Sequence, residues 1–546
     1  MMRRFALRRR FGLLVGVIAV ATMLPTAWTA AAGPSGPRVI PAAAADTSRP
    51  LRELAKEHRT YPPQDAERKE RGRLPTDVGH ERDAALQSEA LAAIPAPIRN
   101  FEGLANSDNP FELSPPDPNG EAGRNHYVEM VNVVLAVYTK TGTRLLGPTP
   151  IGALWDDFAI EDCTDLSGDP VVVYDQLADR WVLTQFTTRG PIYYNCVAVS
   201  TSADPTGSYH RYAFSSGQNF PDYPKYGVWP NAYFLSTREF APDNSFAGIG
   251  AYALERRRML RGDPDARAVS FLVQPGSKPW LTGDGLLPSD LDGSTLPPDG
   301  SPNYFVGTMD SGAFYRAPFD GVNIFAFSVI WSGKPSGSFE LADQLEVAAF
   351  DSIFPCAPQS RSCIPQPQTG NEVDILSYRQ RPTFRLAYRN FGSHESLVTN
   401  QSVEARPGIA GVRWYEIRRT GGQFNVHQQG TFAPNDGVHR WMGSAAQDKV
   451  GNIAVGYSVS NADDVYPGVR YAARLAGDPL GELGLGEGVI INGSGSQRVS
   501  SRWGDYTDMT VDPTDDCTFW YVNEYYAKSS QRGWQTRIAS FKLPGC

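Results

Sequence analysis

A unit of three short strands recurs along the chain from about residue 101, and this repeat limits the possible folds more than any other feature. Each unit opens with a strand that ends in an Asp or Asn turn. An aromatic-rich second strand follows, and then a third strand in which apolar and polar residues alternate. The plainest copy has its strands at 168–175, 180–186 and 196–200. Further copies span 226–254, 290–329, 384–417, 444–475 and 508–541, and one more candidate precedes them at 125–138.

The repeat predicts an all-β fold, a single β-propeller over 101–546. One blade cannot bury both of its faces, but blades stacked around an axis bury them against neighbours and hide most strand edges. We therefore expect seven four-stranded blades, and six or eight would fit if one unit is miscounted. A pair of β-sandwiches is the rival interpretation, because sandwiches also have short strands at regular spacing. The constant order of the three strands favours blades.

The overall composition agrees with short strands joined by tight turns. The 546 residues include 52 Gly and 43 Pro together with 11 Trp, 24 Tyr and 26 Phe, a mixture that disfavours long helices.

The net charge of the chain argues against a nucleic-acid partner. Six Arg and no acidic residue lie in the first 45 residues, so the remainder has 45 basic against 59 acidic residues, a net charge of −14. Phosphate contacts need clustered Lys and Arg, so nucleic acid is excluded as a partner.

The N-terminus has the layout of a secretory signal peptide. Five Arg between residues 3 and 10 precede an apolar run over 11–24, and small residues follow at 27–32. The run is too short for a transmembrane anchor, which needs about 20 residues. We therefore predict a signal peptide over 1–32, with cleavage as late as residue 45 as the alternative, no membrane span after its removal, and a secreted, extracellular or cell-envelope location.

Residues 33–100 differ in texture from the repeat region. They are rich in Pro, Ala and charge and contain few β-branched residues, so they can bury little apolar surface. This composition predicts a linker or pro-segment that is largely disordered.

Six cysteines in an exported chain predict disulfide bonds. They form three sequence-local pairs: Cys163 with Cys196, Cys356 with Cys363, and Cys517 with Cys546. Strands one and three of a blade start at the same end, which makes the first pairing geometrically sensible. The third pairing would fix the C-terminal strand where the ring closes. A zinc site is disfavoured, because no Cys-x-x-Cys spacing occurs.

Four segments resemble a widespread group of bacterial secreted proteins with no assigned activity. They are SGDPVVVYDQLADRWVLTQF (167–186), YPKYGVW (223–229), FRLAYRNFGSHE (384–395) and RWGDYTDMTVDPTDDCTFWYVNEYY (502–526). The resemblance covers roughly 101–546 and implies a propeller of the sialidase-like or galactose-oxidase-like shape in an exported context. It supplies no catalytic residues.

The stretch 515–520 is similar to the sialidase turn motif, but Cys517 replaces the Gly of that motif. No second good copy of the motif occurs in the chain, and both observations argue against sialidase activity.

The candidate ligand-binding residues stand where first strands begin, at one mouth of the expected channel. Carboxylates, arginines and aromatic faces are what a sugar site requires, since planar rings stack on a pyranose and paired carboxylates act as acid and base. The predicted set is Asp169, Asp222, Tyr223, His439, Arg440, Trp441, Arg502, Trp503 and Asp505. The competing interpretation is that recurring Asp and Gly residues cap turns and join blades, because repeats conserve such roles.

From this set we predict a non-catalytic propeller that binds a glycan or an extracellular protein at its channel mouth. The alternative is a carbohydrate-active enzyme, either a glycoside hydrolase or a polysaccharide lyase with Tyr223 and His439 as the proton-transfer pair. We expect a monomer with no metal or cofactor. The stretch 290–293 (DLDG) has part of a calcium loop but lacks the remaining ligands, so we predict a plain turn there. A structural calcium ion is left open, because the chain is strongly acidic.

Overall fold

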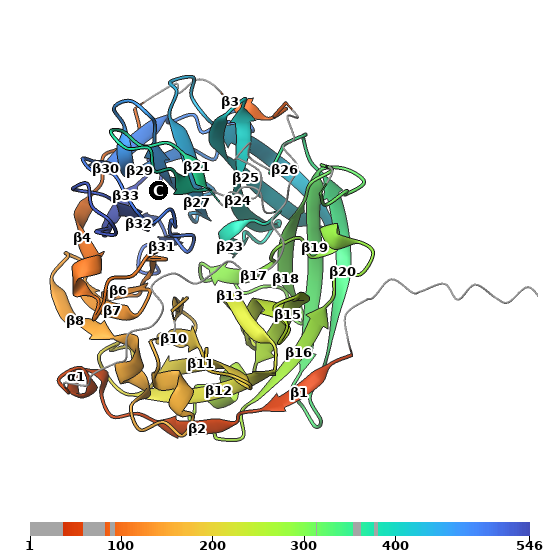
Figure 1. Ribbon diagram of the computed structural model, residues 1–546. Coiled ribbons are helices and arrows are strands. Elements are labelled where there is room, and N and C mark those ends of the chain that lie inside the picture. The colour runs from red at the N-terminus through yellow and green to blue at the C-terminus, as the bar shows by residue number, and fades with distance from the viewer. Residues whose placement is uncertain are drawn as a thin grey trace, which may run out of the picture. The chain divides into compact units, whose positions relative to one another are not determined.

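The computed structural model describes residues 36–57, 82–87, 93–166, 168–312, 314–352, 362–375 and 380–546. The predicted signal peptide lies outside these residues. The described strands form antiparallel sheets arranged around a common centre (Figure 1), so the propeller prediction is confirmed.

Most predicted units correspond to one antiparallel sheet, and the first strand of each unit lies innermost (Figure 1). The first two units consist of β5 (Asn119–Ala122), β6 (His126–Val131), β7 (Val134–Thr139) and β8 (Arg144–Pro150), then β9 (Val171–Asp175), β10 (Arg180–Phe186), β11 (Tyr193–Ser200) and β12 (Tyr209–Gly217). The next two are β13 (Phe220–Val228), β14 (Tyr233–Phe240), β15 (Phe246–Leu254) and β16 (Arg267–Val273), then β17 (Leu287–Asp292), β18 (Asn303–Met309), β19 (Gly321–Ile330) and β20 (Ser336–Glu346).

The second half of the chain repeats the arrangement. Its units are β23 (Thr383–Asn390), β24 (Glu395–Arg406), β25 (Ile409–Thr420) and β26 (Gln423–Phe432), then β27 (His439–Gln447), β28 (Ile453–Ser460), β29 (Tyr466–Arg474) and β30 (Glu487–Gly493), and finally β31 (Asp508–Val511), β32 (Thr518–Tyr525) and β33 (Gln535–Lys542). The innermost strands β17 and β23 pair in parallel and join two units into one nine-stranded sheet. The count of seven blades therefore stays our interpretation, with this sheet divided at that pairing.

Short connections complete the described elements. They are the helices α1 (Leu51–Leu54) and α2 (Arg256–Met259), the 3₁₀ turns η1 (Asn106–Asp108), η2 (Ile151–Trp155), η3 (Glu161–Thr164) and η4 (Pro279–Leu281), and a ribbon of β21 (Ser362–Ile364) and β22 (Val373–Asp374). No helix among the described residues is both long enough and apolar enough to cross a membrane.

The core lies between neighbouring sheets and along the axis. All residues of β5, β9, β17 and β31 are buried, whereas the outermost strands β8 and β20 are largely exposed or half-buried. Alternating apolar residues on both faces of the middle strands supply the packing, because each sheet is covered on both sides by its neighbours.

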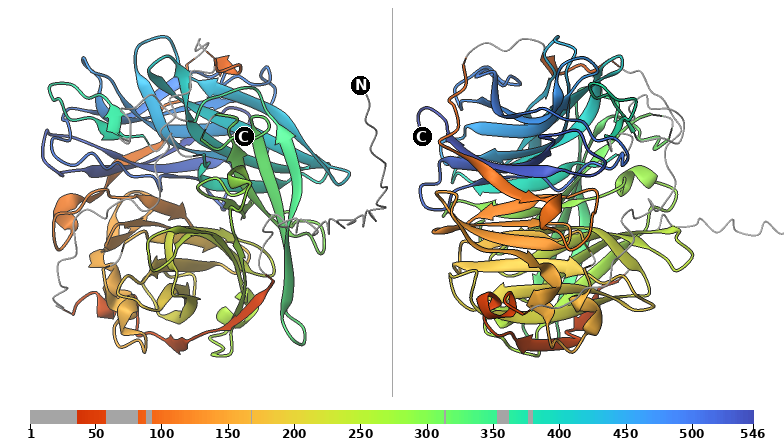
Figure 2. Two further views of the ribbon diagram at one scale, coloured as in Figure 1. Left: turned by 45° about the vertical axis from the view of Figure 1, so that its right-hand side comes forward. Right: turned by 60° about the vertical axis from the view of Figure 1, so that its left-hand side comes forward.

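The segment before the repeats runs along the outside of the sheets instead of forming only a linker. Strand β1 (Arg38–Pro41) pairs with β16, and β2 (Ala44–Thr47) pairs with β12 (Figure 2). Arg211 of β12 holds Asp46 through its guanidinium, with an Nη2–Oδ2 distance of 2.6 Å. Strand β3 (Leu86–Gln87) adds to β26. These strands cover edges that would otherwise leave backbone groups unpaired.

Ring closure joins the two ends of the propeller. Strand β4 (Arg99–Ala105), which precedes the first unit, pairs antiparallel with β33 and becomes the fourth strand of the last one. Glu129 of β6 spans this seam, because its carboxylate accepts hydrogen bonds from the Leu104 backbone N–H at 2.9 Å and from the Thr536 hydroxyl. Gly103 permits the approach, since a Cβ there would collide with the Thr536 hydroxyl.

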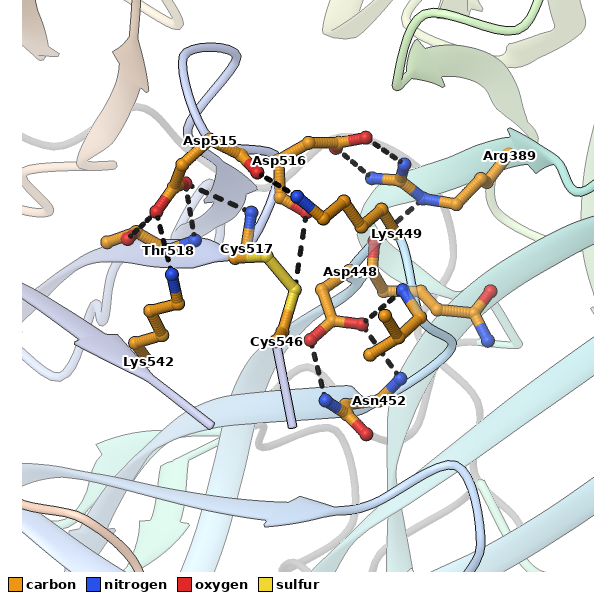
Figure 3. The surroundings of a disulfide bond; sticks show 12 residues. Arg389, Asp448, Lys449, Asn452, Asp515, Asp516, Cys517, Thr518, Lys542 and Cys546 are labelled. Carbon is orange, nitrogen blue, oxygen red and sulfur yellow. Dashed lines mark hydrogen bonds and ion pairs between the residues drawn. A yellow bond between two sulfur atoms is a disulfide. The ribbon is translucent and has the colours of Figure 1, made fainter. Parts of the chain in front are cut away.

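Disulfide bonds join the two long cysteine pairs predicted from the sequence. Cys163 bonds Cys196, and Cys517 bonds Cys546, with Cα–Cα distances of 6.0 and 5.6 Å. Figure 3 shows the second bond fixing the chain end beside the turn after β31. Cys356 lies outside the described residues, so the third pairing stays a prediction.

Turn aspartates surround the Cys517–Cys546 bond and explain much of the Asp recurrence. The Asp448 carboxylate accepts hydrogen bonds from the backbone N–H groups of Val450 and Asn452, both at 3.0 Å. Asp515 likewise accepts from the Cys517 and Thr518 N–H groups (Figure 3). The turn that resembles a sialidase motif is therefore a capped hairpin turn, at the far end of its blade from the start of β31.

Cleavage of the predicted signal peptide should preserve β1. Cleavage after residue 45 would remove β1 and half of β2, whose pairing with β16 and β12 covers two sheet edges. We expect the intact mass of the exported protein to correspond to an N-terminus at or before residue 37. A mature N-terminus at residue 46 would contradict this expectation.

Glu129 should make the ring seam sensitive to pH. Burial is the main cause that raises the pKa of Glu129 to about 7, against about 4.3 in an unfolded chain. Its contribution to stability is therefore complete below about pH 4 and is lost as pH rises to about 7. Relative to Glu129→Gln, the wild type should lose roughly 3 kcal/mol of unfolding free energy between pH 4 and pH 8. Urea titrations at both pH values measure this difference, and parallel profiles for the two proteins would refute it.

Candidate functional site

Charged and aromatic side chains converge where the innermost strands begin. Hydrogen bonds, ion pairs, ring contacts and close electrostatic interactions join residues that lie far apart in the chain, and we call this group the axial cluster. It consists of Asp117, Asp169, Tyr223, Lys225, Arg381, Arg502, Asp505 and Tyr506.

Three cluster residues share an unusual backbone conformation. Asp117, Asp169 and Tyr223 have φ values of 46°, 49° and 55°, and each is followed by proline. A non-glycine residue in this left-handed region costs about 1–3 kcal/mol, and such strain persists only where the surroundings hold it. Asn132 helps to hold it, because its amide donates to the Asp117 carboxylate at 2.7 Å and accepts from the Asp169 N–H at 2.8 Å. Two neighbouring units are thereby joined at the axis.

Lys225 lies at the centre of the cluster with its ammonium enclosed by aromatic rings. It is fully buried, at a bulge of β13. Its Nζ lies 2.9 Å from the ring centroid of Tyr506 and 3.5 Å from that of Tyr223. Burial lowers the pKa of Lys225 well below its usual range. Among the described residues, Nζ has no hydrogen-bond partner.

The cluster carboxylates experience different surroundings. Asp505 is ion-paired with Arg381 at 3.1 Å, and this guanidinium also stacks on Tyr223 at 3.8 Å from the ring centroid. Burial, followed by the negative charges of Asp505 and Asp169, raises the pKa of Asp117 well above its usual range. The Asp117 carboxyl group therefore favours its protonated form, beside the Asp505 side chain that is ion-paired with Arg381.

The more exposed side of the cluster contains one carboxylate, that of Asp169, and one guanidinium, that of Arg502. Asp169 and Arg502 are half-buried. The Asp169 carboxylate accepts a hydrogen bond from the Tyr506 hydroxyl at 2.8 Å, and Arg502 lies 3.7 Å from Asp374 of the β21–β22 ribbon. These two side chains are the least buried of the charged groups in the cluster.

A second charged layer lies one step further along the innermost strands. Arg385 of β23 contacts Asp290 at 2.8 Å and Asp292 at 2.7 Å. Burial raises the pKa values of Glu121 and Asp508 well above their usual range, and the Arg385 charge partly opposes this. The predicted turn at 290–293 is thus mostly part of β17, with both carboxylates bound to a guanidinium. No group of three or more potential metal ligands occurs among the described residues.

The structure brings four of the predicted site residues into the axial cluster: Asp169, Tyr223, Arg502 and Asp505. Asp222 lies next to it, 3.9 Å from Arg238.

Four other predicted residues lie elsewhere. His439 is buried, and burial lowers its pKa to about 4. The Arg440 guanidinium is held by Asp436 and Glu487, each at 2.7 Å. Trp441 and Trp503 pack together with ring centroids 5.5 Å apart and are at most 1% exposed. These rings belong to the core and present no face to a ligand.

Sequence reasoning missed Asp117, Lys225, Arg381 and Tyr506. A usable signal existed for the first two, because Asp117-Pro118 and Tyr223-Pro224-Lys225 parallel Asp169-Pro170 at the start of a first strand. Arg381 and Tyr506 have no such local signal, since only their contacts across the axis identify them.

Comparisons with known proteins return distant likenesses only. No protein-family profile matches the chain, and no curated protein sequence matches it. An endo-arabinase from Bacteroides thetaiotaomicron aligns at 14% identity and a TM-score of 0.26, covering 55% of this chain and 92% of the other. A GH93 α-L-arabinofuranosidase of Fusarium graminearum aligns at 7% identity and a TM-score of 0.29, covering 60% of this chain and 98% of the other. An endosialidase of phage phi92 aligns at 9% identity and a TM-score of 0.32, covering 84% of this chain and 69% of the other.

The fold and site define the protein as a β-propeller with a charged cluster at one end of its axis. At the TM-scores above, the class rests on the strand pairing and not on these likenesses. The resemblance to secreted bacterial propellers of unassigned activity stays an interpretation.

Removing the second-layer guanidinium should destabilise the fold strongly. Arg385→Met leaves the buried Asp290 and Asp292 without the cation that pairs with them, so we expect a loss of about 3–5 kcal/mol in unfolding free energy at pH 7. The loss should shrink at lower pH, because burial raises the pKa values of Asp290, Glu121 and Asp508 and the protonated groups no longer need a cation. Urea titration of Arg385→Met against the exposed control Arg257→Met tests this. Equal stabilities at pH 7 would contradict it.

Proposed function

We propose that this protein is a carbohydrate-active enzyme, a glycoside hydrolase that works at the axial cluster. The observation that carries the proposal is the proximity of two carboxyl groups with opposite surroundings. Burial and like charge favour the protonated form of Asp117, while Asp505 is ion-paired with Arg381 at 3.1 Å. Two neighbouring carboxyl groups in environments this different mark acid and base roles.

The proposed roles follow from those surroundings. Asp117 donates its proton to the glycosidic oxygen as the bond from that oxygen to the anomeric carbon breaks. A water molecule forms the new bond to the anomeric carbon, and Asp505 takes up the proton that this water loses. Asp169 and Arg502, which are half-buried, bind hydroxyl groups of the sugar from the solvent side. The Asp505 N–H approaches the Asp117 carboxylate at 3.3 Å, which keeps the two groups together.

Non-catalytic binding of a glycan or an extracellular protein is the second candidate. It is favoured by the close packing of the cluster, because Asp117, Tyr223, Lys225 and Asp505 are each no more than 6% exposed. An exported location is part of either proposal. The two disulfide bonds and the predicted signal peptide support it.

Asp117→Asn should abolish glycan cleavage. The change removes the transferable proton while an amide oxygen can still accept from Asn132. We expect reducing-end release from a panel of polysaccharides to fall by about 10²- to 10⁴-fold. Wild-type activity should also decline at high pH, as Asp117 loses its proton.

Asp516→Asn is the matched control for this experiment. It breaks an ion pair with Arg389 at the opposite end of the propeller, so it should lower stability without reducing cleavage. If wild-type protein binds glycans and cleaves none, the non-catalytic candidate replaces the hydrolase. If it neither binds nor cleaves any glycan, both carbohydrate assignments fail.

A further inference from the structure

Lys225 is a buried donor to which the described protein offers no acceptor. The cluster around it contains the carboxyl groups of Asp117, Asp169 and Asp505, which all act on it electrostatically. Those carboxyl groups are engaged elsewhere: Asp117 with Asn132, Asp169 with Tyr506 and Asp505 with Arg381. Nζ instead faces the rings of Tyr223, Tyr506 and, at 5.9 Å, Phe384.

The hydroxyl of Tyr223 is a second donor in the same position. Its Oη is buried and has no hydrogen-bond partner among the described residues. Burying a polar group without a partner is costly, and the cost is greater for an ammonium. A structure keeps such groups where a ligand completes them.

We infer that the axial cluster binds an acidic sugar, whose oxyanion accepts hydrogen bonds from the Lys225 ammonium and the Tyr223 hydroxyl. This inference deepens the proposed function, since it assumes that the ligand is a saccharide. The oxyanion is a carboxylate, a sulfate or a phosphate ester, because each offers the strong acceptors that an ammonium favours.

The charges facing Lys225 allow an anion to enter. Arg381 and Arg502 contribute two permanent positive charges, and Asp169 and Asp505 two negative ones. A protonated Asp117 adds no charge, and Asp374 pairs with Arg502 from outside the cluster at 3.7 Å. An arriving oxyanion therefore meets a cluster whose own charges balance, and it stabilises the ammonium form of Lys225. Binding consequently takes up a proton, so affinity should weaken as pH rises.

Ligand binding to the Asp117→Asn protein tests this inference without interference from turnover. The probes are matched oligosaccharides that are neutral, uronic, sulfated or phosphorylated, measured by calorimetry between pH 5 and pH 9. We expect at least one acidic class to bind about 10- to 100-fold more tightly than its neutral match. Adding Lys225→Met should remove that preference, so that the acidic and the neutral oligosaccharide bind with similar affinity.

Two controls keep the outcome interpretable. Lys334→Met changes an exposed lysine and should preserve the preference, whereas Lys225→Arg should retain part of it. Circular dichroism and thermal melting identify a variant that fails to fold. In that case, calorimetry of the Asp117→Asn protein in buffers of different ionisation enthalpy measures the proton uptake on binding. Uptake of a proton with the acidic sugar supports the inference, and no uptake contradicts it.

The failure of this inference differs from that of the proposed function. Equal affinity for acidic and neutral sugars, or a preference that survives Lys225→Met, would overturn the acidic-sugar assignment and leave the hydrolase untouched. Tight, Lys225-dependent binding of an acidic sugar without any cleavage by the wild type would support the inference while the hydrolase fails.

Discussion

Closure of the ring is the constraint on which the rest of this structure depends. The sheets cover each other only if the last one meets the first, and the pairing of β4 with β33 makes that contact from opposite ends of the chain. Glu129 places a buried carboxyl group across the seam, and the Cys517–Cys546 bond fixes the chain end nearby in sequence. The outer strands β1, β2 and β3 then cover edges that closure leaves exposed.

A closed ring brings the starts of its innermost strands together, and this concentrates charge at the axis. Polar residues at those positions cannot be solvated fully, so they must satisfy one another. In the second layer the cation is paired, because Arg385 contacts Asp290 and Asp292, although Asp508 Oδ1 has no hydrogen-bond partner among the described residues. In the axial cluster, the Lys225 ammonium and the Tyr223 hydroxyl have no hydrogen-bond partner among the described residues. A paired cation in one layer and an unpaired one in the other distinguish a structural ion network from a candidate site.

Much of the fold could be predicted from local patterns. Periodicity placed the first three strands of most units close to their observed positions, because alternation and turn residues are local signals. The outer strands before residue 100 were missed, since their pairing depends on edges formed much later in the chain. Within the site, Arg440 and Trp441 were placed at the mouth, but β27 already begins at His439. Arg440 pairs with Asp436 and Glu487, and Trp441 packs against Trp503, so neither side chain joins the axial cluster.

The sequence by itself determined the all-β propeller fold and the two long disulfide pairings, and it pointed to the strand ends where four of the predicted residues meet in the axial cluster. Each of these conclusions follows from the spacing of strands, turns and cysteines along the chain. Only the tertiary structure decided which charged residues meet, because Asp117, Lys225, Arg381 and Asp505 come from four different units or their connections. It also decided their protonation, since the burial and neighbouring charges that shift the pKa values of Asp117 and Lys225 exist only once the ring is closed.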